Sequence, residues 1–593
     1  MSSAANIQIL GRDLRKVFHR ATGELVTALD GISIEAHKAT LTALVGPDGA
    51  GKTTLIRLAA GLMAPDSGEL TVLGFDVAAH PQEVQDRIGY MPQKFGLYED
   101  LSVQENLDLY ADLHGVGGEQ RQQQYLRLME MTALEPFRNR LAGQLSGGMK
   151  QKLGLACTMV REPELLLLDE PTVGVDPLSR RDLWAIILRL VNEQGLSVLL
   201  STSYLDEAER CEHVIVLHSG KALAQGHPGE IAALARDRTF IVAPPAGQPA
   251  RSFQTRLLAE PEILDAVPEA GRVRFVLAGV TPAGSHANNG LPAAKNAVLV
   301  QPRFEDGFMV LLRQTAHQDH PVTTAFPHRP DQPSAEVIVD VRDLVRQFGS
   351  FTAVDHITFE VHRGEVFGLL GPNGAGKTTT FRMLCGLLQA TSGTLHVAGM
   401  DVRHARASAR QQIGYVAQKF SLYGQLSVAE NLEFFASAYG LRGASKRSRI
   451  DWAMAEFELG PLARLPSIQL PGGYKQRLAM AAALLHDPEI LFLDEPTSGA
   501  DPLARREFWQ RITALVEEGV TVIVTTHFME EAEYCDRLVI LDTGRILAQG
   551  TPAEIRSRAP AEPNREPTME DAFLAIVEAG RYPSQADAVG AVA

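Results

Sequence analysis

Two glycine-rich segments of the sequence carry residue types that bind phosphate. The sequence reads GPDGAGKTT over residues 46–54 and GPNGAGKTT over residues 371–379. Each segment follows an apolar run typical of a buried strand and precedes a stretch of helical composition, which is the context that a phosphate-binding loop requires. The glycines let backbone N–H groups turn toward a phosphate chain, and the following helix adds the positive end of its dipole. Both segments therefore predict nucleotide-phosphate sites.

The last residues of each loop supply a positive charge and a metal ligand. We expect Lys52 and Lys377 to reach the β- and γ-phosphates, and the hydroxyls of Thr53 and Thr378 to ligate Mg²⁺. A glycine-rich turn without chemical meaning is the alternative, and the length of the match disfavours it. The expected phosphate-binding residues are Gly46, Gly49, Gly51, Lys52, Thr53, Thr54, Gly371, Gly374, Gly376, Lys377, Thr378 and Thr379.

Two short apolar runs, LLLL and ILFL, end abruptly in carboxylates: Asp169 and Glu170 follow the first, and Asp494 and Glu495 the second. Such runs are typical of buried parallel strands, whose carboxyl ends face the same crevice as a phosphate loop. We expect Asp169 and Asp494 to hold Mg²⁺ through water. Glu170 and Glu495 are then placed to orient and deprotonate an attacking water. A plain acidic loop start is the alternative, and the presence of two copies beside two phosphate loops disfavours it.

These motifs lie in a tandem repeat. An offset of 325 positions relates the two phosphate loops, and it also relates Gln93 to Gln418. The two glutamines, further catalytic candidates, each begin a polar and aromatic stretch. Ser203 and His527 are related by 324 positions, so the repeat is nearly ungapped. Phe18 and Phe348 end the strand-like segments that open the copies; they are placed to stack on an adenine, or else fill the core.

Composition limits the classes of function. The 593 residues exceed what one core can hold, and the apolar fraction of 45% with a charged fraction of 21% describes a folded soluble protein. A net charge of −15, from 56 basic and 71 acidic residues, argues against a nucleic-acid scaffold. The sequence has no apolar run long enough to span a membrane and no signal pattern, so we expect a cytoplasmic location. The four cysteines lack metal-ligand spacing.

The copies differ after their shared core. Residues 239–300 form an insertion that the second copy lacks, and its strand-like and helical stretches predict a small α+β appendage. Both copies then end alike, in PRFEDGF and PTMEDAF. A proline-rich stretch with three histidines joins them, and we favour a semi-rigid tether over metal capture. The expected domains are the first repeat (7–235), the appendage (236–313), the linker (314–336) and the second repeat with its C-terminal tail (337–577).

The segment LSGGMKQ at residues 145–151, between a phosphate loop and an Asp-Glu strand, resembles the signature of ATP-binding-cassette (ABC) ATPases. The resemblance covers both copies. It implies an α/β fold of two tandem P-loop NTPase cassettes, each with a helical subdomain, and intramolecular pairing of the cassettes around two ATP molecules. Each site would take its phosphate loop from one cassette and its signature from the other. The implied signature contacts are Ser146, Gly147, Gly148, Gly472 and Gly473.

Two departures from the family pattern fall in one composite site. The second signature has Pro471 where the family has serine, and Ser203 stands where the family has the switch histidine. Both belong to the site built on loop 46–54. The site built on loop 371–379 keeps Ser146 and His527, so we expect nearly all turnover there. Proline is tolerated in the first turn of a helix, so the fold survives.

The phrases GLYEDLSVQENL and SLYGQLSVAENL resemble the subgroup of ATPases that drive ABC-2-type exporters, including drug-efflux systems. This resemblance implies an ATP-hydrolysing subunit that powers export of drugs or other hydrophobic compounds through separate integral membrane subunits. Such a subunit would lie at the inner face of the cell membrane without spanning it. A double-cassette importer ATPase and a ribosome-associated twin-cassette factor are the alternatives. A ribosome-associated factor would require a long basic linker. The linker here is short and proline-rich and the whole chain is acidic, so this alternative is disfavoured.

Overall fold

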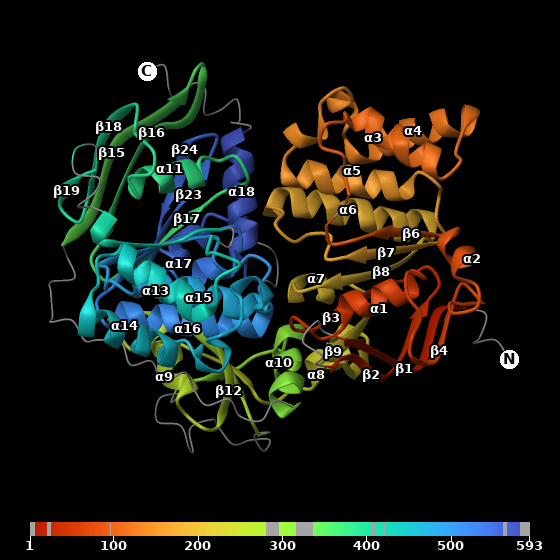
Figure 1. Ribbon diagram of the computed structural model, residues 1–593, viewed down its shortest axis with the longest axis horizontal. Coiled ribbons are helices and arrows are strands. Elements are labelled where there is room, and N and C mark those ends of the chain that lie inside the picture. The colour runs from red at the N-terminus through yellow and green to blue at the C-terminus, as the bar shows by residue number, and fades with distance from the viewer. Residues whose placement is uncertain are drawn as a thin grey trace.

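The computed structural model describes residues 6–19, 25–94, 96–279, 296–315, 336–402, 404, 410–418, 421–560 and 566–581. Most of the proline-rich stretch that we expect to act as a linker lies outside these residues. Within them the chain forms two similar α/β units side by side, with a smaller unit beneath the second (Figure 1).

The core of the first unit is a mostly parallel six-stranded sheet. Its strands are short and mostly apolar, and the three central ones, β3, β7 and β8, are buried along their whole length, as expected for a sheet covered on both faces. The strand order is β10-β9-β3-β8-β7-β6, with β10 antiparallel at one edge. The bounds are β3 (Leu41–Val45), β6 (Ile88–Met91), β7 (Leu165–Asp169), β8 (Ser197–Thr202), β9 (His213–His218) and β10 (Lys221–Gly226).

An antiparallel sheet of order β2-β1-β4-β5 covers one side of this core. It buries alternate residues, such as Ile32, Ile34 and Ala36, against the helix that follows the phosphate loop. Its strands are β1 (Ile7–His19), β2 (Leu25–His37), β4 (Ser67–Val72) and β5 (Phe75–Asp76). The helices next to it are α1 (Lys52–Ala59) and α2 (Pro81–Gln85).

Helices form the other side of the first unit. Ser102 caps α3 in a capping box with Glu105, which fixes where the helical region begins. Leu107, Leu128 and Leu153 pack between three of these helices. The bounds are α3 (Val103–Leu113), α4 (Gly118–Thr132), α5 (Gly147–Met159), α6 (Pro177–Gln194), α7 (Leu205–Glu209) and α8 (Pro228–Ala233), with short 3-10 turns η2 (Glu135–Phe137) and η3 (Ala142–Gln144).

The second unit repeats this plan. Its six-stranded sheet has the order β20-β21-β22-β17-β23-β24 and its antiparallel sheet the order β16-β15-β18-β19. The strands are β15 (Val337–Phe348), β16 (Phe351–His362), β17 (Val366–Leu370), β18 (Ser392–Val397), β19 (Met400–Asp401), β20 (Ile413–Val416), β21 (Ile490–Asp494), β22 (Thr521–Thr526), β23 (Arg537–Asp542) and β24 (Arg545–Gly550). The helices are α11 (Lys377–Leu384), α13 (Val428–Ala438), α14 (Gly443–Glu456), η6 (Gly460–Leu462), η7 (Ser467–Gln469), α15 (Gly472–Leu484), α16 (Pro502–Glu517), η8 (Glu531–Tyr534), α17 (Pro552–Arg556) and α18 (Met569–Arg581).

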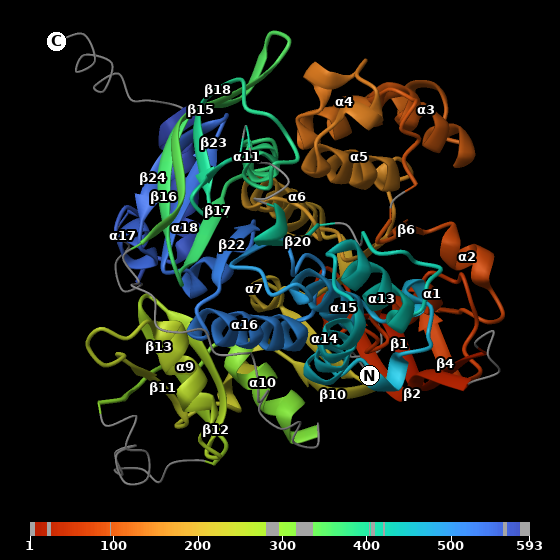
Figure 2. The same ribbon diagram turned by 60° about the vertical axis from the view of Figure 1, so that its left-hand side comes forward.

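Between the two units, the chain forms a small four-stranded antiparallel sheet of order β12-β13-β11-β14 with one helix packed on it. Its elements are β11 (Thr239–Val242), α9 (Ala250–Leu258), β12 (Ile263–Glu269), β13 (Arg272–Leu277) and β14 (Val298–Leu299), and α10 (Phe304–Thr315) follows. We call residues 239–299 the appendage. It follows the first unit in sequence, yet both views place it beside α16 of the second (Figures 1 and 2).

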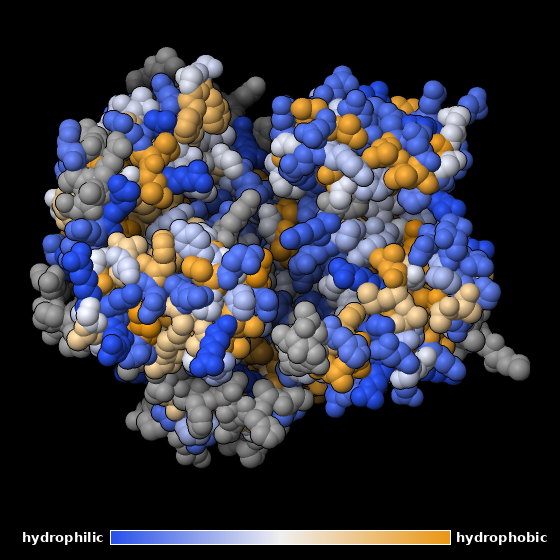
Figure 3. All heavy atoms as spheres, viewed as in Figure 1, coloured by the Kyte–Doolittle hydropathy of each residue, from blue (hydrophilic) through white to orange (hydrophobic). Residues whose placement is uncertain are grey.

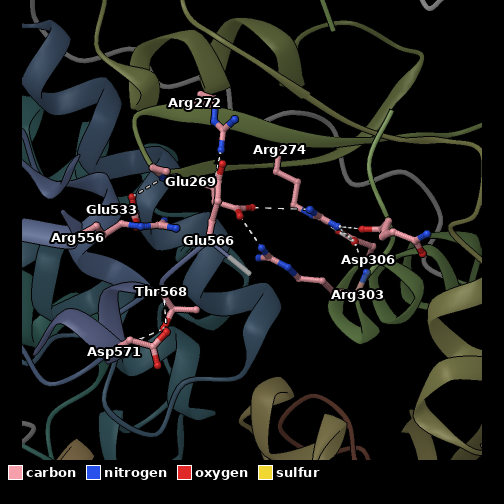
Figure 4. A network of polar contacts seen from close by, with 12 residues as sticks. Glu269, Arg272, Arg274, Arg303, Asp306, Glu533, Arg556, Glu566, Thr568 and Asp571 are labelled. Atoms are coloured by element: carbon pink, nitrogen blue, oxygen red, sulfur yellow. Dashed lines mark hydrogen bonds and ion pairs between the residues drawn. The ribbon is translucent and has the colours of Figure 1, made fainter. Parts of the chain in front are cut away.

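Ion pairs join the appendage to the second unit. Arg251 of α9, 7% exposed, binds Asp536 through two hydrogen bonds of 3.2 and 2.8 Å. Arg506 of α16 lies 3.3 Å from Asp265 and 2.5 Å from Glu305. Figure 4 shows the polar network at the adjoining edge, where Arg272 of β13 contacts Glu566 at 2.5 Å. The appendage, which follows the first unit in sequence, is therefore attached to the second unit by ion pairs.

The repeated P-x-x-E-D-x-F ending has a defined structural role. Its phenylalanines, Phe308 of α10 and Phe573 of α18, are fully buried in their own units. Its glutamates reach the opposite unit: Glu570 accepts two hydrogen bonds of 3.1 Å from Arg180 of α6, and Glu305 contacts Arg506 of α16. We call these two contacts, each between an ending and a helix of the other unit, the reciprocal clasp.

In the described part of the chain, no helix is both long and apolar enough to cross a membrane. The surface mixes hydrophilic and hydrophobic residues, with apolar side chains over both helical regions (Figure 3). They include Tyr98, Leu113 and Leu126 in the first unit and Tyr423, Phe434 and Ile468 in the second.

Candidate functional site

The phosphate loops connect a central strand of each large sheet to a helix, β3 to α1 and β17 to α11. Gly51 has φ +106° and Gly376 has φ +98°, a region in which a side chain is strained. A Cβ built on Gly46 would lie 2.1 Å from the carbonyl oxygen of Leu217, so no larger residue fits. The glycines named from the sequence are therefore required by the backbone at these three positions.

Both loop lysines are buried and fold back onto their own loops. Lys52 Nζ donates to the carbonyl oxygen of Gly46 at 2.7 Å, and Lys377 Nζ donates to that of Gly371 at 2.6 Å. Burial lowers the pKa of Lys377, and the carboxylates of Glu495, Asp176 and Asp494 oppose this effect. Each ammonium is thus held against the backbone of the loop that we expect to bind a phosphate chain.

The metal-binding candidates meet at the first site. Thr53 Oγ1 donates to Asp169 Oδ1 at 3.1 Å, and Ser201 Oγ donates to the same oxygen at 2.7 Å. The other oxygen, Asp169 Oδ2, is buried and has no hydrogen-bond partner among the described residues. A free carboxylate oxygen beside a threonine hydroxyl fits a Mg²⁺ ion held through water.

At the second site, Thr525 Oγ1 donates to Asp494 Oδ1 at 2.6 Å, as Ser201 does at the first. Burial raises the pKa of Asp494, and the neighbouring Glu495 charge adds to the effect, while the Thr525 hydrogen bond opposes it. Thr378 lies in the first turn of α11, next to Lys377. A cation would stabilise the ionised form of Asp494 here, so these residues also fit Mg²⁺.

The glutamates after β7 and β21 adopt an unusual backbone. Glu170 has φ 50° and Glu495 has φ 46°, the left-handed region that residues other than glycine seldom occupy. Such strain persists where surrounding contacts impose it, often at functional sites. Gln93 Nε2 donates to Glu170 Oε2 at 2.5 Å, and Gln418 Nε2 donates to Glu495 Oε2 at 2.7 Å. Each of the two glutamines therefore contacts the glutamate of its own unit.

The two switch positions differ. His527 Nδ1 lies 3.1 Å from Glu495 Oε2. Burial favours the protonated form of Glu495, but the hydrogen bond and charge of His527, together with Lys377, hold the pKa of Glu495 below its ordinary value. Ser203 is buried at the equivalent place, and within the described residues it makes no hydrogen bond to Glu170. Only one glutamate is therefore oriented by a switch residue.

Each phosphate loop faces the signature of the other unit. A Cβ built on Gly472 would lie 3.2 Å from Asp48 Oδ2, and one built on Gly147 would lie 3.7 Å from Asn373 Nδ2. The N–H of Asp48 also donates to Asp501 Oδ2, across the units, at 3.2 Å. The structure thus brings together the head-to-tail sites that the resemblance implies.

The signature helices begin differently. Ser146 Oγ accepts a hydrogen bond of 3.3 Å from the N–H of Met149 and caps α5. Pro471, which precedes α15, provides no side-chain cap. Gly148 packs against Ser179, and Gly473 lies near Ala504. The missing cap thus belongs to the site that also lacks the switch histidine.

The two aromatic residues that we expect to stack on adenine lie at the surface. Phe18 is 39% exposed and Phe348 is 47% exposed, so neither fills the core. Lys16 Nζ lies 5.9 Å from the ring centroid of Phe18, and the guanidinium of Arg346 lies 4.4 Å from that of Phe348. Each ring thus has a cationic neighbour and is partly exposed.

Sequence reasoning missed several residues that shape these sites. The hydroxyls of Ser201 and Thr525 donate to the metal-binding candidates Asp169 and Asp494. The same hydroxyls accept the N–H of Glu170 at 2.9 Å and of Glu495 at 3.0 Å. The repeat offset of 324 relates these two hydroxyls and would have identified them. Tyr204 and Phe528, which follow the switch positions, stack across the units with ring centroids 5.4 Å apart. Only the pairing of the units reveals that contact.

Comparison with known families and proteins agrees with this geometry. A family model described as "ABC transporter" matches residues 29–173 and 354–498. The "Probable multidrug ABC transporter ATP-binding protein YbhF" of Escherichia coli (strain K12) is 50% identical over 542 residues, which cover 91% of this chain and 93% of that protein. The similarity thus extends over both units and the region between them.

Shorter relatives match about one unit. The "Nod factor export ATP-binding protein I" of Ralstonia nicotianae (strain ATCC BAA-1114 / GMI1000) is 44% identical over 219 residues, covering 37% of this chain and 68% of that protein. A solved structure titled "Structure of ATP binding subunit of ABC transporter" is 30% identical and covers 40% of this chain and 99% of its own, with a TM-score of 0.37.

Proposed function

The chain belongs to the ABC transporter family of ATPases, and from this premise we propose that it is the energy-coupling subunit of an ABC-2-type exporter. The observation that carries the proposal is the 50% identity, over nine-tenths of the chain, with a protein named as a multidrug transporter's ATP-binding protein. A second relative is named for Nod factor export. Drugs or other hydrophobic compounds are the proposed substrate class.

The chemistry is centred on loop 371–379. Glu495 is the proposed base that orients and deprotonates the attacking water, and His527 and Gln418 hold it in place. Lys377 and the loop N–H groups bind the phosphates, and Ser146 with Gly147 and Gly148 closes the site from the other cassette. When bound, Mg²⁺ would neutralise negative charge that develops on the phosphates. Thr378 and Asp494 would hold it.

The site built on loop 46–54 has a different role. It keeps Lys52, Thr53, Asp169 and Glu170, so it binds nucleotide, but it lacks a switch histidine and a signature hydroxyl. Bound nucleotide there holds the cassettes together while the other site turns over. Closing and reopening of that other site moves separate integral membrane subunits between two states. The chain itself lies at the inner face of the cell membrane.

Purification tests the proposal. The tagged chain, taken from detergent-solubilised membranes, is expected to carry one or two polytopic membrane proteins, and the ATPase activity of that complex is expected to rise with the exported compound. The variant E495Q should assemble normally but lose the stimulated activity. Sedimentation of most of the chain with ribosomes in low salt would contradict the export function.

A further inference from the structure

The two phosphate loops differ at their third residue, which is Asp48 in the first and Asn373 in the second. Both side chains point across the seam toward the opposite signature. Asp48 Oδ2 lies 3.2 Å from the position of a Cβ on Gly472, and Asn373 Nδ2 lies 3.7 Å from that on Gly147. An acceptor-only carboxylate thus stands where the other site has an amide that can donate hydrogen bonds.

The surroundings of Asp48 are rich in negative charge. Asp501 of the second cassette accepts the N–H of Asp48 at 3.2 Å. Glu170, which lies 3.6 Å from Lys52, is close enough for its charge to act on Asp48. The signature helix α15 contributes Gly472 at contact distance, and Lys475 is the charged residue of its first turn. Burial raises the pKa of Asp48 to about 6, and the negative charge of Asp501 is the second largest cause. The charge of Lys52 lowers this pKa, and that of Glu170 raises it slightly further.

The opposing carboxylates also differ between the sites. Both oxygens of Asp176 accept hydrogen bonds within its own cassette, because Ser179 donates through its N–H at 3.2 Å and its hydroxyl at 2.9 Å. The charge of Asp176 also acts on Lys377 of the other cassette. Asp501 has Ala504 at the corresponding place, which supplies only the N–H at 3.0 Å. Its second oxygen is therefore directed at the backbone of Asp48. Two carboxylates and a triphosphate would meet at this seam.

We propose that Asp48 sets the nucleotide specificity of the first composite site by excluding the γ-phosphate of ATP from the seam unless the carboxyl is protonated. ADP, which ends one phosphate earlier, is accepted in both protonation states. Closure of this site on ATP therefore takes up one proton, whereas closure of the site that carries Asn373 does not. This inference rests on the pairing of the cassettes and is independent of the export function.

The size of the effect follows from the protonated fraction. Because only that fraction binds ATP, the apparent Kd of the first site should rise about tenfold for each pH unit above about 6. At pH 8 the substitution D48N should therefore lower that Kd by up to about 100-fold. The affinity for ADP should change little. Asparagine occurs naturally at the equivalent position of the second loop, so the variant is expected to fold.

The experiment uses the full chain with the substitutions E170Q and E495Q, which remove hydrolysis at both sites. Equilibrium dialysis with Mg-ATP and with Mg-ADP is run between pH 5.5 and 8 on this parent and on the same protein carrying D48N. We expect one tight and one pH-dependent ATP site in the parent, and two tight sites in the D48N protein. Protonation of the nucleotide itself affects both proteins equally, so the comparison between them cancels it.

The substitution N373D provides the matched control, because it places a carboxylate in the second loop. It should give the parent a second pH-dependent ATP site. Identical ATP affinities and pH profiles in the parent and the D48N protein would overturn the proposal, as would an equal gain of affinity for ADP. Neither result would affect the test of the export function, because co-purification with membrane proteins and stimulated ATPase activity are measured separately.

Discussion

At the scale of residues, the two ATP sites share their phosphate-binding parts and differ in the groups around the attacking water. Lys52 and Lys377 make the same backbone contacts, and both glutamates receive a glutamine hydrogen bond. Only Glu495 has a histidine at 3.1 Å. Loss of one donor to the transition state typically costs about 10²–10³ in rate. The first site lacks two such groups, at Ser203 and Pro471.

We therefore expect E495Q to abolish steady ATP hydrolysis and E170Q to leave a substantial fraction of it. The physical reason is that only Glu495 has a switch histidine in contact with it, so we expect nearly all turnover at that site. Steady-state phosphate release by the two purified variants, at saturating Mg-ATP, measures the difference. Matching losses in the two proteins would contradict the asymmetry.

The combination of S203H and P471S is the matched control, introduced into the E495Q protein. It returns a switch histidine and a signature hydroxyl to the first site, so measurable hydrolysis should reappear. The gain should exceed the sum of the two single gains, because groups that act on one transition state are not additive. No recovery would show that another difference, such as Asp48, also limits this site.

The residues of each site could be predicted from the sequence because their chemistry depends on local motifs. A glycine loop between a strand and a helix, and an Asp-Glu pair after an apolar strand, lead to the same crevice whatever surrounds them. The contact of Asp48 with Asp501, and the stacking of Tyr204 on Phe528, depend on how two cassettes meet. Nothing in the spacing of one cassette encodes that geometry.

At the scale of elements, the attachment of the appendage to α16 rests on a buried ion pair. Arg506 is 11% exposed and Asp265 is 7% exposed. Removing one partner of a buried pair typically costs about 3–5 kcal/mol, because the other charge is left uncompensated. We expect R506A to lower the midpoint of urea unfolding accordingly. The matched control is R181A, the equivalent position in α6, whose pair with Glu578 is about half exposed and worth less than about 1 kcal/mol.

The pH dependence of the R506A defect has a defined sign. Burial raises the pKa of Asp265, and the positive charge of Arg506 limits this rise. Without Arg506 this pKa rises further above its unfolded value, so ionisation of Asp265 opposes folding as the pH increases. The deficit of R506A should be largest near pH 8 and shrink toward pH 5. A deficit independent of pH would indicate lost packing instead of an unpaired charge.

The irregular segments between the glutamines and the helices α3 and α13 carry a second element-scale prediction. Leu97 and Leu422 pack against their own cores, whereas Tyr98 is 56% exposed and Tyr423 is 50% exposed. If the tyrosines dock the membrane subunits, Y98D or Y423D should reduce transport while basal ATPase activity persists. L97D should lose both activities through unfolding. Equal loss of transport and ATPase activity in the tyrosine variants would assign them a core role.

At the scale of the whole molecule, the contacts between the cassettes are of two kinds. The reciprocal clasp and the appendage join them by ion pairs that need no nucleotide. The composite sites, by contrast, are lined by phosphate loops and by the N-terminal ends of the signature helices, which we expect to bind nucleotide phosphates. We therefore expect one region that stays joined through the cycle and two regions that close on ATP. Motion during the cycle should be a rotation about the clasp.

Spin labels can test this motion, because all four native cysteines are buried and only introduced ones will react. One pair of label positions is L126C in α4 and L387C in the turn after α11, both of which are exposed. The two positions lie on different cassettes, and the distance between them reports on the site built on loop 371–379. The other pair, A185C with A579C, joins exposed residues of α6 and α18 beside the clasp. In the E495Q protein, Mg-ATP should shorten the first distance by several Å and leave the second unchanged. Equal changes in both distances would mean that the cassettes separate as free bodies and that the clasp does not act as a hinge.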